Sequence, residues 1–141
     1  MENFKSDDEK ETFILNNFKV IGVVGCSRVE GKPSHDIPKY MKDAGYKIIP
    51  INPNADTIFG EKSYPDLNSV PFKIDIVDVF RPANETLKIA EDAFKIGAKV
   101  VWLQEGIVNE DTENYCQKHE LLFVMNRCIM KEYIRLIEKI T

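Results

Sequence analysis

The sequence predicts a single α/β domain, doubly wound, with a mostly parallel five-stranded sheet and helices on both faces. Two patterns predict this class. Short apolar runs alternate along the chain with segments of helical periodicity, and the first run breaks directly into a loop of glycine and small polar residues. The chain has 141 residues, which is enough to bury one core. We expect one domain over residues 1–141, with residues 1–17 as an N-terminal helical extension.

The chain is expected to begin with a helix and then a strand. Ser6 followed by Glu9 is a capping-box pattern, in which each residue satisfies a backbone N–H at the start of a helix. This pattern opens a short helix that carries the apolar residues 13–15. The apolar residues 20–25 then form the first strand.

A crossover helix and a second strand should follow. The helix is expected to begin around residues 35–37, with Pro38 in its first turn, where a missing N–H is tolerated. Gly45 should end it. Residues 47–51 form the second strand, and Pro50 indicates that this strand lies at an edge or is ending, because proline cannot donate to a ladder.

The second half of the chain continues the alternation. Residues 54–73 show no clear periodicity and predict an irregular connection with one short strand or helical turn. A helix after residue 82 should end at Gly97. Its expected inward-facing residues are Leu87, Ala90, Ala93, Phe94 and Ile96. Three more strands are expected at residues 75–80, 99–103 and 121–125, with helices at residues 110–119 and at the end of the chain.

The loop after the first strand predicts a phosphate-bearing ligand. Gly25 and the small residues after it present backbone N–H groups and a helix N-terminus, which favour phosphate. A dinucleotide fingerprint is disfavoured, because Ser27 and Glu30 occupy its second and third glycine positions. A Walker loop is also disfavoured, because five residues separate Gly25 from Gly31 and a proline follows Lys32.

Ligands on open parallel sheets bind at the carboxyl ends of the strands, so the residues that leave the strands form one candidate site. Arginine and lysine are prominent among them, although the chain is acidic overall, and guanidinium groups bind phosphate oxygens bidentately. The candidate ligand-binding residues are Gly25, Cys26, Ser27, Arg28, Lys32, Pro33, Ser34, Asn52, Pro53, Phe80, Arg81, Pro82, Gln104, Glu105, Gly106, Ile107, Asn126 and Arg127.

Charge and composition exclude several classes of function. A formal net charge of −4 argues against a nucleic-acid or acidic-membrane partner, because either would need a basic face. No signal peptide or membrane-spanning run is expected, so the predicted location is cytoplasmic. The histidines, cysteines and carboxylates show no metal-ligand spacing, and no metal is expected.

Some candidate residues have a structural alternative. Cys26 precedes a helix N-terminus and a basic residue, which predicts a lowered thiol pKa and reactivity with a ligand thiol; burial as a small apolar residue is the commoner role for Cys26 and for Cys128. Glu105 is a candidate general base or, more simply, a structural or ligand-binding group. Trp102 is expected in the core, and His35 is expected to face solvent in the first turn of its helix.

The sequence resembles the stand-alone coenzyme A-binding proteins, which are single Rossmann-like domains similar to the coenzyme A-binding domain of the succinyl-CoA synthetase alpha subunit. The resemblance is carried by residues 20–27, 45–54, 60–65, 75–82, 97–104 and 126–128. It implies that the diphosphate lies on the loop at residues 25–34 and that the adenine lies near Asn52, Pro53 and residues 80–82. It also implies that residues 104–107, Asn126 and Arg127 border the cleft.

These inferences predict non-covalent binding of coenzyme A or an acyl-CoA, with no catalytic residue assigned. The synthetase's phosphohistidine belongs to a second domain and has no counterpart in this chain, so the resemblance does not imply ligase activity. Two alternatives stay open. One is a coenzyme A-linked thiol-redox protein, an acyl-CoA enzyme or a ligase subunit. The other is a nucleotide-responsive interaction module. A homo-oligomer and a separate ligase-type subunit both stay open as partners.

Overall fold

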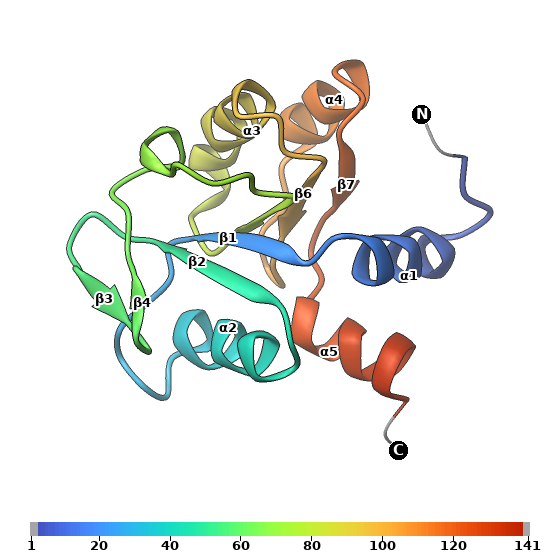
Figure 1. Cartoon of the computed structure of the whole chain (residues 1–141). Helices are drawn as coiled ribbons and strands as arrows, with labels where there is room; N and C mark the ends of the chain where they lie inside the picture. Colours follow the sequence, from blue (N-terminus) through green and yellow to red (C-terminus); the bar gives the residue numbers. More distant parts are fainter. Residues whose placement is uncertain (1–2, 140–141) are drawn as a thin grey trace.

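A five-stranded parallel sheet forms the centre of the protein (Figure 1). The structure, a computed structural model, describes residues 3–139. Within this range the strand order is β2-β1-β5-β6-β7. The strands are β1 (Val20–Val24), β2 (Lys47–Ile51), β5 (Ile76–Val79), β6 (Val100–Leu103) and β7 (Leu122–Val124). The predicted α/β class is confirmed, and the chain winds from β1 to one side and then crosses to the other.

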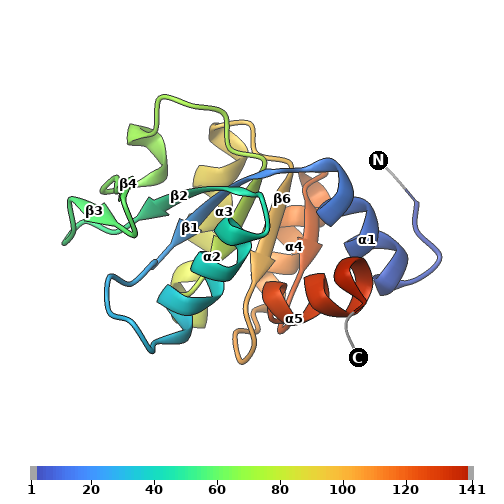
Figure 2. The same cartoon turned by 60° about the horizontal axis from the view of Figure 1, so that its bottom comes forward.

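Helices cover both faces of the sheet (Figures 1 and 2). One face carries α1 (Asp7–Asn17), α2 (Pro33–Asp43) and α5 (Ile129–Tyr133), which a π-helical turn (Ile134–Glu138) extends. The other face carries α3 (Thr86–Lys95) and α4 (Glu110–Lys118). Because side chains alternate along a strand, each face has its own apolar core.

Trp102 illustrates this alternation. It is fully buried on the α1, α2 and α5 side, and its Nε1 donates a hydrogen bond to the carbonyl of Arg127 over 2.8 Å. Its neighbours Val101 and Leu103 point to the opposite core. The expected core role of Trp102 is confirmed.

The N-terminal helix begins as the capping-box pattern predicts. Ser6 is the N-cap, and its Oγ accepts a hydrogen bond from the N–H of Glu9 over 3.1 Å. Ile14 and Leu15 are fully buried against the sheet. The acidic residues in the first turn of α1 also interact favourably with the positive end of the helix dipole.

Glu11 of α1 is a fully buried carboxyl group in a cluster that joins α1 to α5. Arg127 Nε lies 3.3 Å from Glu11 Oε2, and Arg127 NH1 lies 3.1 Å from Glu132 Oε1. Arg135 pairs with Glu132 at 2.8 Å and with Asp8 at 2.7 Å. Neither carboxyl oxygen of Glu11 accepts a hydrogen bond from the described residues. Burial and the nearby Glu132 carboxylate raise the pKa of Glu11 to about 8.

We expect this cluster to make stability depend on pH. The folded protein keeps a proton on Glu11 that the unfolded chain releases above the ordinary glutamate pKa of 4.5, so the free energy of unfolding should fall as pH rises from 4.5 to about 8. Glu11→Gln should reduce this decline but not remove it, because the buried carboxyl group of Asp78 also has a raised pKa, of about 7, and contributes in the same direction. Urea unfolding across the range, with the exposed Glu9→Gln as control, measures it, and an identical decline in both variants would refute the assignment to Glu11.

The helix α2 begins earlier than predicted, at Pro33 rather than at residues 35–37. Pro33 takes the first helical position, where no N–H is needed, and Lys32 is the N-cap. Pro38 therefore lies inside the helix instead of in its first turn. Its missing N–H leaves the carbonyl of Ser34 without its helical donor.

The connection at residues 54–73 contains more structure than predicted. β3 (Thr57–Ile58) and β4 (Glu61–Lys62) form a small antiparallel hairpin, and a 3₁₀ turn (Leu67–Ser69) follows. Tyr64 pairs in parallel with Ile51 on the outer side of β2. The expectation from Pro50 is confirmed, because β2 is an edge strand of the main sheet.

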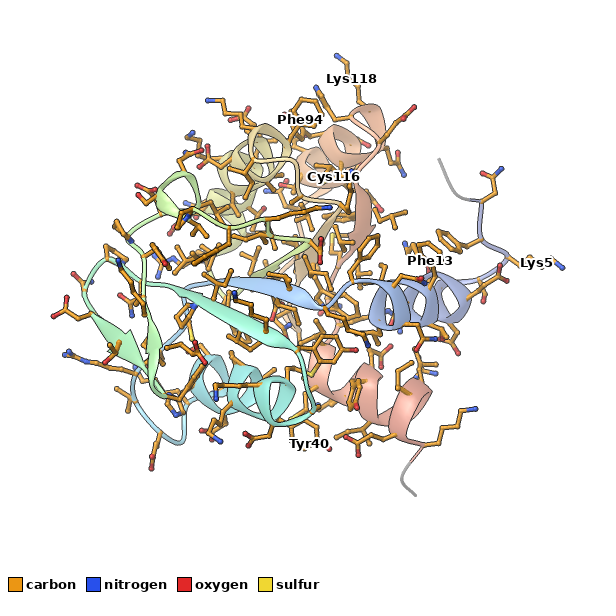
Figure 3. All side chains as sticks on the ribbon, in the orientation of Figure 1. Lys5, Phe13, Tyr40, Phe94, Cys116 and Lys118 are labelled. Carbon is orange, nitrogen blue, oxygen red and sulfur yellow. The ribbon has the colours of Figure 1, made fainter. Side chains whose placement is uncertain are left out.

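Phe94 differs from its predicted inward position. Its side chain is 46% exposed on the outer surface of α3 (Figure 3), and its ring centroid lies 4.8 Å from that of His119, the residue that follows α4. The buried face of α3 instead consists of Thr86, Ile89, Ala90 and Ala93. One residue beyond Ala93 is a rotation of about 100° around the helix, which carries Phe94 off that face.

Candidate functional site

The strand order places a crevice at the carboxyl ends of β1 and β5. After β1 the chain goes to β2 on one side, whereas β5 pairs with β1 on the other side. This reversal is the point of an open α/β sheet at which ligands bind. The loops that follow β1 and β5 therefore form the centre of the candidate site.

Gly25 allows these two loops to approach closely. It has a φ of +87°, and a Cβ atom built on it would lie 2.6 Å from the carbonyl oxygen of Phe80. Its N–H donates to the carbonyl of Ile51 over 3.0 Å. The glycine is thus required by the backbone packing of β1 against the end of β5, and its N–H is already used within the protein.

The next part of the loop is fixed by the start of α2. Ser27 N–H donates over 3.0 Å to the carbonyl of Ser34, the group that Pro38 leaves without a helical donor. The carbonyl of Ser27 lies 2.7 Å from Nδ1 of His35. His35 is buried against Phe59, so the expectation that it faces solvent is wrong. These bonds hold the loop in one conformation.

The first of two cavities opens on the β2 side of this loop and measures about 570 Å³. We call it the β2-side cavity. Asn52 helps to shape it, because its Nδ2 donates to the carbonyl of Cys26 over 2.9 Å. The cavity is lined by Val24, Gly25, Cys26, Ser27, Lys32, Ser34, Ile51, Asn52, Pro53, Asn54, Pro65, Asp66, Leu67, Phe80, Arg81, Glu85, Ile89 and Asp92.

The second cavity, about 660 Å³, lies toward β7 between the starts of α2 and α5. We call it the β7-side cavity. It is lined by Lys32, Pro33, Ser34, Ile37, Phe80, Arg81, Pro82, Gln104, Glu105, Ile107, Cys128, Met130 and Lys131. The two cavities share Lys32, Ser34, Phe80 and Arg81 as walls. Together they form a two-part groove with two basic side chains at its junction.

The two junction cations differ in their partners. Arg81 makes a two-point ion pair with Glu85, with hydrogen bonds of 3.0 and 2.9 Å. Within residues 3–139, Lys32 has no ion-pair partner, and its side chain lines both cavities. Lys32 is therefore available to an anionic ligand, whereas Arg81 would have to exchange Glu85 for that ligand.

Four of the predicted site residues lie outside both cavities: Arg28, Gly106, Asn126 and Arg127. Arg28 is exposed on the loop. Asn126 Oδ1 accepts from the N–H of Gly106 over 2.7 Å, which joins the loops after β6 and β7. Arg127 turns toward Glu11 and Glu132 instead of the groove. The other fourteen predicted residues line one cavity or both.

The cysteines lie in apolar surroundings. Cys26 is fully buried, and burial together with the nearby Asp78 carboxyl raises its pKa to about 12. The expectation of a lowered thiol pKa at Cys26 is wrong, because loss of solvation outweighs the helix N-terminus. Burial likewise raises the pKa of Cys128.

Asp78 is a buried acid that the sequence analysis did not single out. Gln104 Nε2 donates to Asp78 Oδ1 over 2.5 Å, and burial raises the pKa of Asp78 to about 7. This pair fixes the amide of Gln104 at the edge of the β7-side cavity. In the sequence, the signal for this buried acid is a single acidic residue inside an otherwise apolar strand. The cavities also contain residues that strand-end reasoning missed, namely Ile37, Pro65, Asp66, Leu67, Glu85, Ile89, Asp92, Met130 and Lys131.

Doubly wound domains with a groove at this position form a class that binds nucleotides and other phosphate-bearing ligands. Comparison with known sequences defines the class further. This chain belongs to the family described as CoA binding domain, whose sequence pattern matches residues 19–134. The resemblance found in the sequence is thereby confirmed.

Relatives of this chain include both stand-alone proteins and parts of ligases. The uncharacterized protein YneT of Bacillus subtilis is 38% identical over 129 residues, which cover 92% of this chain and 94% of YneT. The acetate–CoA ligase (ADP-forming) of Methanocaldococcus jannaschii is 38% identical over 81 residues, which cover 57% of this chain and only 12% of the ligase. Most of the ligase therefore has no counterpart in the aligned region.

Solved structures show the same two kinds of relative. A hypothetical protein from Pyrococcus horikoshii has a TM-score of 0.90 and 35% identity, covering 97% of this chain and 99% of that protein. The dinucleotide-forming acetyl-coenzyme A synthetase 1 of Ca. Korarchaeum cryptofilum has a TM-score of 0.69 and 27% identity, covering 81% of this chain and 27% of the synthetase.

Among residues 3–139, no helix is long and apolar enough to cross a membrane.

Proposed function

We propose that this protein binds coenzyme A or an acyl-CoA non-covalently in the two-part groove. The observation that carries the proposal is the junction of the two cavities, where Lys32 and Arg81 lie between a chamber on the β2 side and one on the β7 side. Coenzyme A has the matching order of parts: a nucleoside, a diphosphate and a long arm. The β2-side cavity would hold the nucleoside and the β7-side cavity the arm.

The loop suits a diphosphate at this junction. Because its backbone is fixed by the bonds of Gly25, Ser27 and Asn52, little conformational entropy is lost on binding. Charge at the junction would come from side chains more than from the Gly25 and Ser27 amides, which already have acceptors in the protein.

The geometry favours binding over catalysis. Cys26 and Cys128 are buried thiols with raised pKa values. Glu105 Oε1 is paired with Lys131 Nζ at 2.8 Å. None of these three side chains is thus prepared to act as a nucleophile or a base. A cytoplasmic location is part of the proposal, and a homo-oligomer and a separate ligase-type subunit are the two alternatives for a protein partner.

Removing the junction cations should weaken binding. We expect Lys32→Ala and Arg81→Ala each to reduce affinity for coenzyme A by about 1–3 kcal/mol, because a hydrogen bond to a charged group is lost. Arg28→Ala is the matched control, since Arg28 lies on the same loop outside both cavities. Isothermal titration calorimetry measures all three. Equal affinities in the wild type and both junction variants would mean that the phosphates of the ligand bind elsewhere on the protein.

The ligand class is tested by thermal shift. Coenzyme A should raise the melting temperature more than dephospho-coenzyme A or NAD at equal concentration, because stabilisation follows affinity for the folded state. Stronger stabilisation by NAD would contradict the proposal. Native mass spectrometry of freshly purified protein identifies any copurified ligand by its mass.

A further inference from the structure

The β7-side cavity is larger than the proposed arm of coenzyme A requires. Its volume, about 660 Å³, exceeds the 570 Å³ of the β2-side cavity. The pantetheine arm, however, has fewer non-hydrogen atoms than the nucleoside 3′-phosphate that the β2-side cavity would hold. Space therefore remains beyond the arm.

The walls of this space are suited to an apolar group. Beyond the junction, Pro33, Ile37, Pro82, Ile107 and Met130 line the cavity. Ligand pockets combine apolar walls with a few placed polar groups, and here Gln104, held by Asp78, is such a group for the amides of the arm. The free thiol of coenzyme A would leave most of this apolar surface uncovered.

The thiol and the carboxylate that line the same cavity are not prepared to cleave a thioester. Cys128 is 4% exposed, and burial raises its pKa. Glu105 is engaged by Lys131 at the rim. A thioester placed here would be bound intact.

From these observations we propose that the β7-side cavity binds the acyl chain of an acyl-CoA, so that the preferred ligand is a thioester rather than free coenzyme A. The inference rests on the proposed function, because the junction at Lys32 and Arg81 orients the ligand. The acyl chain would contact the apolar lining residues Ile37, Ile107 and Met130.

The test is a chain-length series by isothermal titration calorimetry, with coenzyme A, acetyl-CoA, butyryl-CoA and hexanoyl-CoA. Burial of a methylene contributes about 0.8 kcal/mol, so affinity should rise roughly threefold to fourfold for each methylene until the cavity is filled. Thioesters that bind no tighter than coenzyme A would overturn the inference and leave the proposed function standing. Failure of coenzyme A and all thioesters to bind would overturn both.

A cavity-filling variant localises the effect. Met130→Trp should abolish the chain-length dependence, so that hexanoyl-CoA binds this variant no more tightly than coenzyme A does. Val108→Trp is the control, since Val108 is 51% exposed and lies outside both cavities. Full chain-length dependence in a folded Met130→Trp protein would overturn the assignment to this cavity. If that variant does not fold, the wild-type series still decides whether an acyl chain is preferred.

Discussion

Gly25→Val is expected to destabilise the fold by about 3–4 kcal/mol, beyond any effect on ligand binding. Valine would have to adopt a φ of +87°, and its Cβ would lie 2.6 Å from the carbonyl oxygen of Phe80 and 2.9 Å from Cδ of Arg81. The backbone carbonyl has no free space into which it can move, because β5 is held between β1 and β6. Urea unfolding of the variant measures the loss.

Gly31→Val is the matched control, on the same loop. Gly31 has a φ of +93° but no atom within 4 Å of a built Cβ, so only the backbone conformation is penalised, by about 1–2 kcal/mol. The difference between the variants isolates the close approach to Phe80. Equal losses of unfolding free energy at both positions would mean that the ends of β1 and β5 can move apart to accommodate a valine side chain. A stable Gly25→Val protein that does not bind coenzyme A would instead mean that Gly25 is required for ligand binding and not for the fold.

The pattern of the sequence predicted the sheet and most residues of the groove because these depend on local properties. Val and Ile runs specify strands, and strand ends must meet at one edge of a parallel sheet. The loop after β1 lies at that edge for the same reason. Its glycine, however, serves the contact with Phe80, which is 55 residues away in the chain. A contact over that separation has no local pattern.

Side-chain direction was the other part that the sequence left undetermined. Arg81 and Arg127 both leave strands at the same edge, yet Arg81 lines both cavities and Arg127 pairs with Glu11. The pKa of Cys26 was misjudged similarly, because the loop around a thiol is visible in the sequence and the depth of its burial is not. Ion pairs and burial depend on which distant elements pack together.

Arg127→Met should separate a structural role from a ligand-binding one. The substitution keeps an unbranched, largely aliphatic side chain and removes the cation beside Glu11 and Glu132. Breaking a buried ion pair costs about 3–5 kcal/mol, and we expect about 2–3 kcal/mol here because the Arg127 side chain is 39% exposed and Arg135 still pairs with Glu132. Affinity for coenzyme A should stay unchanged, because Arg127 lines neither cavity of the groove.

A double-mutant cycle with Glu11→Gln identifies the carboxylate responsible. Once Glu11 is replaced by an uncharged amide, the loss of Arg127 no longer leaves that buried acid without a counterion, so Arg127→Met should cost at least about 1 kcal/mol less in the Glu11→Gln background. Urea unfolding of the wild type, both single variants and the double variant at pH 9, above the pKa of about 8 of Glu11 and therefore with this carboxyl group ionised, gives this coupling. Strictly additive losses would show that Arg127 acts through Asp7 or Glu132 instead. A folded Arg127→Met protein that no longer binds coenzyme A would return Arg127 to the ligand-binding site, where strand-end reasoning first placed it.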